Sequence, residues 1–163
     1  MFCAKSIRTI AAAVGLTLIV SVAGLHAQQK SEADVVLAAN HDFDKALSSR
    51  DIVAMDKAWA HEPYVIVIHP VSKAASIGWD AVKESWGKIF DRWAEISVSM
   101  TDPQVRIIQD VAWVVGVETV QGKLKNGEAV SSTAFATNIF EKREGRWLMV
   151  LHTASRVPKA AAF

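Results

Sequence analysis

The chain contains a single cysteine among its 163 residues, and this residue, Cys3, lies close to the amino terminus. The rest of the chain therefore has no disulfide, no thiol nucleophile and no thiolate ligand for a metal ion. Gly-x-Ser-x-Gly, the nucleophile elbow of many hydrolases, is missing, and so is a phosphate-binding loop. The five histidines form neither His-x-His nor His-Glu-x-x-His, so we expect no metal site and no bound cofactor.

Long hydrophobic runs are missing except near the amino terminus. There, Lys5 and Arg8 precede an apolar run from Ile10 to Leu25, which is the pattern of a secretory signal peptide. Glycine and hydroxyl residues interrupt the run, and it is short for a membrane span. The alternative to a cleaved signal peptide is that the segment is retained as a membrane anchor. We expect residues 1–27 to be removed, residues 28–163 to form one domain, and the protein to be periplasmic or secreted.

An excess of charge of one sign is also missing. The full chain has 18 basic and 17 acidic residues, and removal of residues 1–27 leaves 16 basic residues and a net charge of −1. Nucleic acids and anionic membrane surfaces attract strongly basic proteins. We therefore expect neither of them as a partner of the mature chain.

What the sequence does contain is a series of helical patterns followed by strands. A first helix is predicted from Ser31, because Ser31 and Asp34 resemble a capping box. A second covers Asp51 to His61, and a third covers Trp79 to Trp93 with Trp86 on its apolar stripe.

Strands are predicted at Tyr64–His69, Ile96–Met100 and Gln104–Gln109, and two hairpins follow. The order of helix, helix, strand, helix and then antiparallel strands predicts an α+β fold. Its three amino-terminal helices pack on one side of a curved, mostly antiparallel sheet.

The second hairpin, Ala134 to Ser155, turns at Glu144-Gly145. We expect a three-residue loop, because a two-residue loop would need a positive φ at Glu144. This register places Phe140 opposite Val150 and Asn138 opposite His152, so the amide and the imidazole share one face. A slip of one residue would put them on opposite faces.

The first hairpin carries Asn126-Gly127, which predicts a two-residue turn with Lys125 opposite Glu128. Counting back from this turn gives a face that is apolar apart from the amide and the imidazole. It consists of Trp113, Val115, Val117, Ala136, Asn138, Phe140, Val150, His152 and Ala154. We expect no carboxylate on it, and we expect Asp44 and Asp56 on the helices to face water.

The opposite face of the predicted sheet is also largely apolar. It consists of Val114, Gly116, Phe135, Thr137, Ile139, Met149, Leu151 and Thr153. A sheet with two apolar faces must be covered on both sides. The helices can cover one side, so we expect a second copy of the chain on the other, giving a homodimer.

Several segments together resemble a known family. They are Phe43-x-x-Ala46-Leu47, Asp51-x-x-Ala54-Met55, Val67-Ile68-His69-Pro70, Gly78-Trp79-x-Ala81-Val82, Ser85-Trp86, Thr137-Asn138-Ile139-Phe140, Gly145-Arg146-Trp147 and Ala154-Ser155. Residues 32–158 are in this way similar to a SnoaL-like domain of the nuclear transport factor 2-like and ketosteroid isomerase-like superfamily. The resemblance implies a cone-shaped α+β fold, a cavity between the helices and the concave face of the sheet, and a homodimer formed through the other face.

We interpret the cavity as the site of a small, mostly apolar molecule. The candidate ligand-binding residues are Asn138, His152, Trp86, Trp113, Phe140, Val115, Trp59 and His69. The alternative is an enzyme of the isomerase, dehydratase or cyclase kind, with His152 or His69 as its general acid or base. In a third interpretation the histidines are hydrogen-bonded core residues, and the tryptophans fill the interior of a structural dimer.

Overall fold

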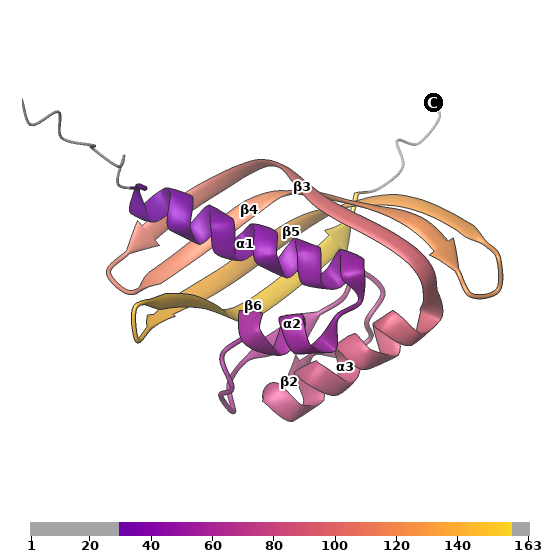
Figure 1. The fold of residues 1–163 in the computed structure, drawn as a ribbon, viewed down its shortest axis with the longest axis horizontal. Helices are drawn as coiled ribbons and strands as arrows, with labels where there is room; N and C mark the ends of the chain where they lie inside the picture. The colour runs from indigo at the N-terminus through magenta and orange to yellow at the C-terminus, as the bar shows by residue number, and fades with distance from the viewer. Residues whose placement is uncertain (1–29, 158–163) are drawn as a thin grey trace, which may run out of the picture.

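The computed structural model describes residues 30–157, so the expected signal peptide, residues 1–27, lies outside the described part. Three helices lie on one side of a six-stranded sheet (Figure 1). The helices are α1 (Glu32–Ser49), α2 (Ile52–Ala58) and α3 (Trp79–Arg92). The strands are β1 (Ile66–Ile68), β2 (Ser76–Ile77), β3 (Trp93–Ile108), β4 (Val111–Leu124), β5 (Ala129–Arg143) and β6 (Arg146–Arg156).

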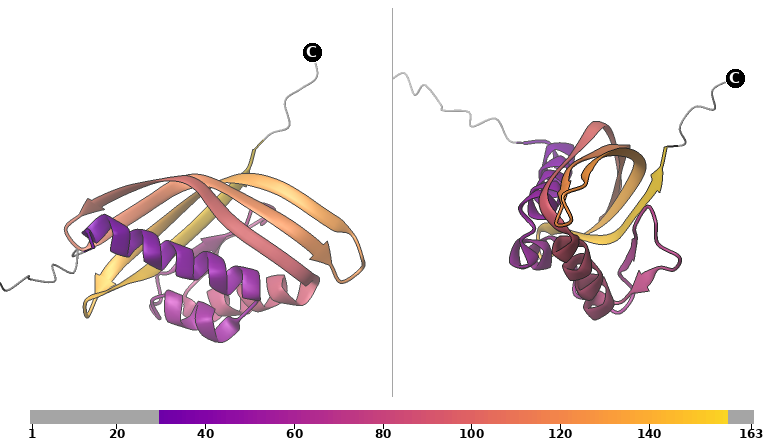
Figure 2. Two further views of the ribbon diagram at one scale, coloured as in Figure 1. Left: turned by 45° about the horizontal axis from the view of Figure 1, so that its top comes forward. Right: turned by 90° about the vertical axis from the view of Figure 1, so that its right-hand side faces the viewer.

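The order of the strands in the sheet is β2-β1-β6-β5-β4-β3. Neighbouring strands are antiparallel except β1 and β6, which are parallel. The sheet curves around the helices, which lie on its concave side (Figure 2). The predicted α+β architecture is therefore confirmed.

The helices begin where the sequence predicts. Ser31 caps α1 through both bonds of a capping box with Asp34. The second helix is shorter than expected and ends at Ala58, because Trp59 leaves it to pair with Met149 of β6. The two predicted strands after α3 are one bent strand, β3, in which a bulge around Pro103 replaces the expected break.

The turn of the β5–β6 hairpin differs from the prediction. Glu144 and Gly145 form a two-residue turn, with φ of 50° and 79°, and Arg143 pairs with Arg146. A bulge after Met149 then adds one residue to β6 and restores the register, so Asn138 does pair with His152. The predicted loop length was wrong and the central pair was right, because the bulge offsets the shorter turn.

The β4–β5 register is shifted by one residue from the prediction. The loop has three residues instead of two: Leu124 N donates to Glu128 O at 2.8 Å, and Gly127 has a φ of 91°. A type I turn that ends in a left-handed glycine explains this loop. As a result, Val114 instead of Val115 lies opposite Asn138.

This shift exchanges the two faces of β4. Trp113, Val115 and Val117 lie on the convex face, whereas the concave face has Ala112, Val114, Gly116 and Glu118. The predicted face was therefore wrong for β4 and right for most of β5 and β6. Met149 is a further correction, because its buried side chain lies in the core under the helices.

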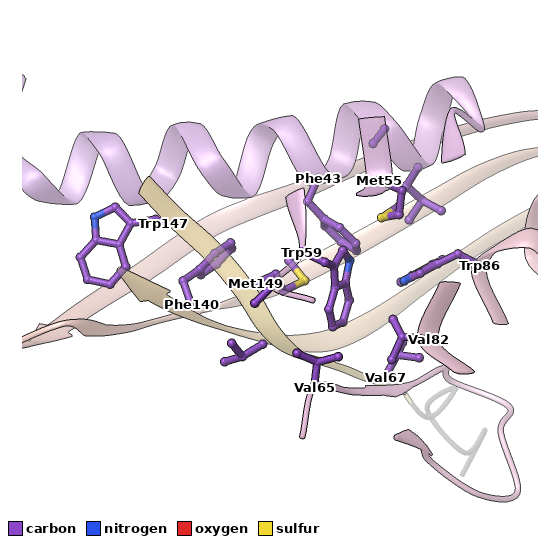
Figure 3. Close-up of a cluster of buried hydrophobic side chains, with 14 of the residues drawn as sticks. Phe43, Met55, Trp59, Val65, Val67, Val82, Trp86, Phe140, Trp147 and Met149 are labelled. Atoms are coloured by element: carbon purple, nitrogen blue, oxygen red, sulfur yellow. The ribbon is translucent and has the colours of Figure 1, made fainter. Parts of the chain in front are cut away.

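The core lies between the helices and the concave face of the sheet. Its largest fully buried side chains come from both layers (Figure 3). They include Phe43, Met55, Trp59, Trp86, Phe140 and Met149. Among residues 30–157, no helix is long and apolar enough to cross a membrane.

Candidate functional site

The predicted pair, Asn138 on β5 and His152 on β6, is buried beneath α1. Nδ1 of His152 lies 2.7 Å from Oδ1 of Asn138, and Nδ2 of Asn138 donates to Oδ1 of Asn40 at 2.7 Å. Since the nitrogen of this amide is its donor, the oxygen accepts, and Nδ1 of His152 carries the hydrogen. The three side chains thus form a hydrogen-bonded chain from the sheet to α1.

The second predicted histidine, His69, follows β1 and is half-buried. Its Nε2 lies 2.7 Å from the hydroxyl oxygen of Ser85 on α3. The ring centroid of His69 lies 4.6 Å from that of Trp86, and the centroid of His152 lies 5.6 Å from it. The structure therefore brings both histidines to the same indole.

Neither imidazole is charged at neutral pH. Burial lowers the pKa of His152 to about 3, and the nearby His69 adds to this shift. Burial also lowers the pKa of His69 to about 4. Such imidazoles can hydrogen-bond to a ligand, but they are weak bases at pH 7.

The remaining predicted residues divide between the two sides of the sheet. Trp59 and Phe140 lie in the interior, and the ring of Trp59 lies 6.5 Å from that of Trp86. Trp113 and Val115 were predicted to line the site, but they lie on the convex face because of the shift in the register of β4. Val115 is 39% exposed there.

Two carboxyl groups that we expected to lie outside the interior are buried in it. Asp44 on α1 is 5% exposed and Glu118 on β4 is 3% exposed. The helical period contained a signal for Asp44, because Val36, Asn40 and Asp44 follow at intervals of four residues and are all buried. The burial of Glu118 follows from the shifted register, which no pattern in β4 itself indicates.

Burial makes both carboxyl groups weaker acids than a carboxyl group in water. It raises the pKa of Asp44 to about 7, to which repulsion by Glu118 also contributes, while a hydrogen bond from the backbone of Met100 opposes the shift. Burial alone raises the pKa of Glu118 to about 7. Among residues 30–157, Oδ1 of Asp44 and Oε2 of Glu118 have no hydrogen-bond partner.

Small side chains and one methionine lie beside the two carboxyl groups: Glu118 pairs with Ala134 on one side and with Met100 on the other. Ala134, Ala136 and Ala154 form a separate apolar cluster on the sheet, against which Met100 packs. Gly116 leaves room for Met100, because a Cβ there would come within 2.7 Å of its Cγ. The Sδ of Met100 lies 3.9 Å from Nδ2 of Asn40.

We call Asn40, Asp44, Glu118, Asn138 and His152 together the interior polar cluster.

Two surface grooves, of about 650 and 630 Å³, lie elsewhere, beside α2 and the β5–β6 turn. Neither of these two grooves is lined by a residue of the interior polar cluster. In residues 30–157, no three His, Cys, Asp or Glu side chains are grouped so that they could hold a metal ion.

Comparisons with known proteins identify relatives of the whole domain. Residues 36–160 match the sequence model of a SnoaL-like domain. The F-box protein SKIP8 of Arabidopsis thaliana is 31% identical over 121 residues, covering 74% of this chain and 48% of the plant protein. The chain thus spans about half the length of this curated relative.

Solved structures with a similar fold include three bacterial proteins. A nuclear transport factor 2-like family protein from Streptomyces avermitilis is 24% identical, with a TM-score of 0.70, over 77% of this chain and 96% of that one. A superfamily member from Salmonella enterica is 14% identical, with a TM-score of 0.73, over 80% and 94%. A ketosteroid isomerase-like protein from Erwinia carotovora is 18% identical, with a TM-score of 0.68, over 80% and 99%. The TM-scores show a shared fold, and at such low sequence identities they show the fold alone.

Proposed function

The chain belongs to the SnoaL-like domain family, and we propose that it binds a small, mostly apolar molecule between the helices and the concave face of the sheet. One observation carries this proposal. Four buried polar atoms lack a hydrogen-bond partner among residues 30–157: Oδ1 of Asp44, Oε2 of Glu118, and Nε1 of Trp59 and Trp86.

Buried polar groups in proteins are nearly always hydrogen-bonded. Each one left without a partner costs about 1–3 kcal/mol. The four atoms include two carboxyl oxygens and two N–H donors, and most of the side chains buried around them are apolar. A ligand with a few polar groups on an apolar body supplies partners for such a set, and the Asn138–His152 pair would fix its orientation.

Binding can be tested with N-phenyl-1-naphthylamine, a neutral apolar probe that becomes fluorescent in an apolar environment. We expect saturable binding to the folded protein. Ala136→Leu, which enlarges a concave side chain beside Asn138, should weaken binding at least tenfold. Thr137→Leu is the matched control, because Thr137 is the next residue on β5 and lies on the convex face.

Mass spectrometry of the natively purified protein would identify a molecule that co-purifies with it. The proposal is wrong if the folded protein neither binds the probe nor carries a small molecule. Binding that Ala136→Leu leaves unchanged would place the ligand outside the interior and would also contradict the proposal.

A second candidate function is that of an isomerase or dehydratase. The observation that favours it is the buried carboxyl pair, since a general acid or base is most effective when its pKa lies near the working pH. We predicted His152 or His69 for this role from the sequence, but the lowered pKa of each makes the carboxyl groups better candidates. Turnover that survives both Asp44→Asn and Glu118→Gln would exclude the carboxyl pair as its acid and base.

The convex face supports a proposal about assembly. Val115 and Phe135 expose apolar side chains there, Phe135 to 57%, and exposed apolar patches of this kind mark interaction sites. We propose that a second copy of the chain covers this face. Phe135→Glu should convert the dimer to a monomer in analytical ultracentrifugation, whereas Val53→Glu on the exposed side of α2 should not.

The location of the protein is proposed from residues 1–27, whose sequence has the pattern of a secretory signal. We propose that the mature protein is periplasmic or secreted. Amino-terminal sequencing of the protein from cell fractions tests this, with cleavage near residue 27 expected. A membrane-bound protein that keeps this segment would identify it as an anchor instead.

A further inference from the structure

The buried carboxyl pair lacks the positive charge that normally accompanies a buried acid. The ion pairs among residues 30–157 join Lys83, Lys88, Lys142, Arg143 and His61 to other acidic residues. Neither Asp44 nor Glu118 takes part in any of these ion pairs. Buried charges in proteins are nearly always paired or bound to a metal ion, and these two acids have no such partner within the described chain.

The free oxygens of the pair come from two layers of the fold. Asp44 is on α1 and Glu118 is on β4, and Met100 of β3 connects them: Met100 pairs with Glu118 in the sheet, and its backbone donates a hydrogen bond to the carboxyl group of Asp44. Each residue is more than nine-tenths buried, and each has one carboxyl oxygen without a partner. An ammonium group has three N–H donors and no acceptor, and it can satisfy both oxygens at once.

The surroundings determine what the rest of the ligand is like. The sheet has a cluster of small apolar side chains here, those of Ala134, Ala136 and Ala154, and Ala134 pairs with Glu118. Met100 packs against them and is half-buried. Methionine is unbranched and adapts its shape easily, so a movement of its side chain would admit an apolar body.

We infer that the ligand is a primary amine on an apolar body, whose ammonium group is held between Asp44 and Glu118. This inference rests on the proposed function and adds the chemical class of the ligand. A cation relieves the repulsion between the two carboxyl groups, a neutral molecule does not, and an anion increases it. The expected order of affinity is therefore amine, alcohol, carboxylate.

Three compounds of nearly equal size and shape test this order: cyclohexylmethylamine, cyclohexylmethanol and cyclohexanecarboxylate. Isothermal titration calorimetry at pH 7 should give an affinity for the amine at least tenfold higher than for the alcohol, and the lowest affinity for the carboxylate. Measurements in two buffers with different ionisation enthalpies should show release of a proton when the amine binds, because the cation favours the ionised form of the carboxyl groups.

Two variants locate the effect. Glu118→Gln and Asp44→Asn keep the shape of the side chains but remove the carboxyl group. Each should reduce the affinity for the amine at least tenfold and change the affinity for the alcohol less than threefold. Glu128→Gln, on the exposed loop between β4 and β5, is the matched control and should change neither.

The outcomes separate this inference from the proposed function. If the amine and the alcohol bind equally well, the inference is wrong and the binding function stands. If none of the three compounds binds and the apolar probe does not bind either, the proposed function fails as well. The comparison of ligands and the proton release need no variant, so they decide the question even if a substitution prevents folding.

Discussion

The interior of the domain has two halves that differ in the size of their side chains. The aromatic half contains Phe43, Trp59, Trp86, Phe140 and Met149. The carboxyl half contains Met100, Ala134, Ala136 and Ala154 around Asp44 and Glu118. Large side chains fill the first half, whereas the second half has small ones. Each half contains two of the four buried polar atoms that lack a partner among residues 30–157.

Burial has opposite effects on the ionisable groups of the two halves. It lowers the pKa of His152 beside Trp86 and raises the pKa of Asp44 and Glu118. Both changes favour the neutral form, since an apolar environment destabilises any charge. The aromatic half therefore stabilises the fold, whereas the carboxyl half lowers stability at neutral pH, because its buried acids resist ionisation.

The largest expected effect lies in the aromatic half. Trp86→Ala should lower the free energy of unfolding by about 3–5 kcal/mol, because it removes a buried indole that packs on Phe43 and both histidines. Urea denaturation measures the change. Val53→Ala, at an exposed position on α2, is the control and should change the free energy by less than about 0.5 kcal/mol. A small effect of Trp86→Ala would mean that this half is not close-packed.

The next effect lies in the carboxyl half and depends on pH. In the folded state the pKa of Glu118 is about 7, above its ordinary value of 4.5, so the folded state binds the proton more tightly than the unfolded state. The stability that the protonated group contributes is present below about pH 4.5 and is lost as the pH rises to about 7. Glu118→Gln removes this loss.

The free energy of unfolding of Glu118→Gln, relative to the wild type, should therefore increase by about 3 kcal/mol between pH 4.5 and pH 7.5. Denaturation curves at four pH values in this interval would show the increase. A difference that stays constant over the interval would mean that Glu118 keeps an ordinary pKa in the folded protein.

Asn138 lies between the two halves and connects His152 to Asn40. Asn138→Ala should cost about 1–3 kcal/mol, because it leaves buried groups of both neighbours without partners. Thr137→Ala on the convex face is the control. In the variant, histidine signals measured by NMR should show increased motion of the His152 ring, and an unchanged ring would argue against this connection.

The smallest change in stability is expected when an alanine is replaced by valine, and we compare one such replacement in each half. Ala112→Val, in the large cluster that contains the aromatic half, should cost about 1–3 kcal/mol through overpacking. Ala154→Val, in the carboxyl half, should change stability by less than about 1 kcal/mol, because small side chains surround it. Thermal denaturation of the two variants tests this, and equal losses would show that both halves are packed alike.

The sequence by itself determined the elements of the fold. The capping box at Ser31, the turn glycines and the periodicity of the helices are local features, and local energies decide them. The pairing of Asn138 with His152 was also predicted correctly, although a shorter turn and a bulge produced it in place of the expected loop.

The tertiary structure alone decided which face of β4 meets the helices. Asn126-Gly127 is compatible with a loop of two or three residues, and the choice of one extra residue turns every side chain of β4 to the other face. That choice brings Glu118 into the interior, where Asp44 of α1 is also buried. The pKa of both carboxyl groups then depends on the amount of water that the surrounding chain excludes, and this is a property of the packed fold that no local pattern contains.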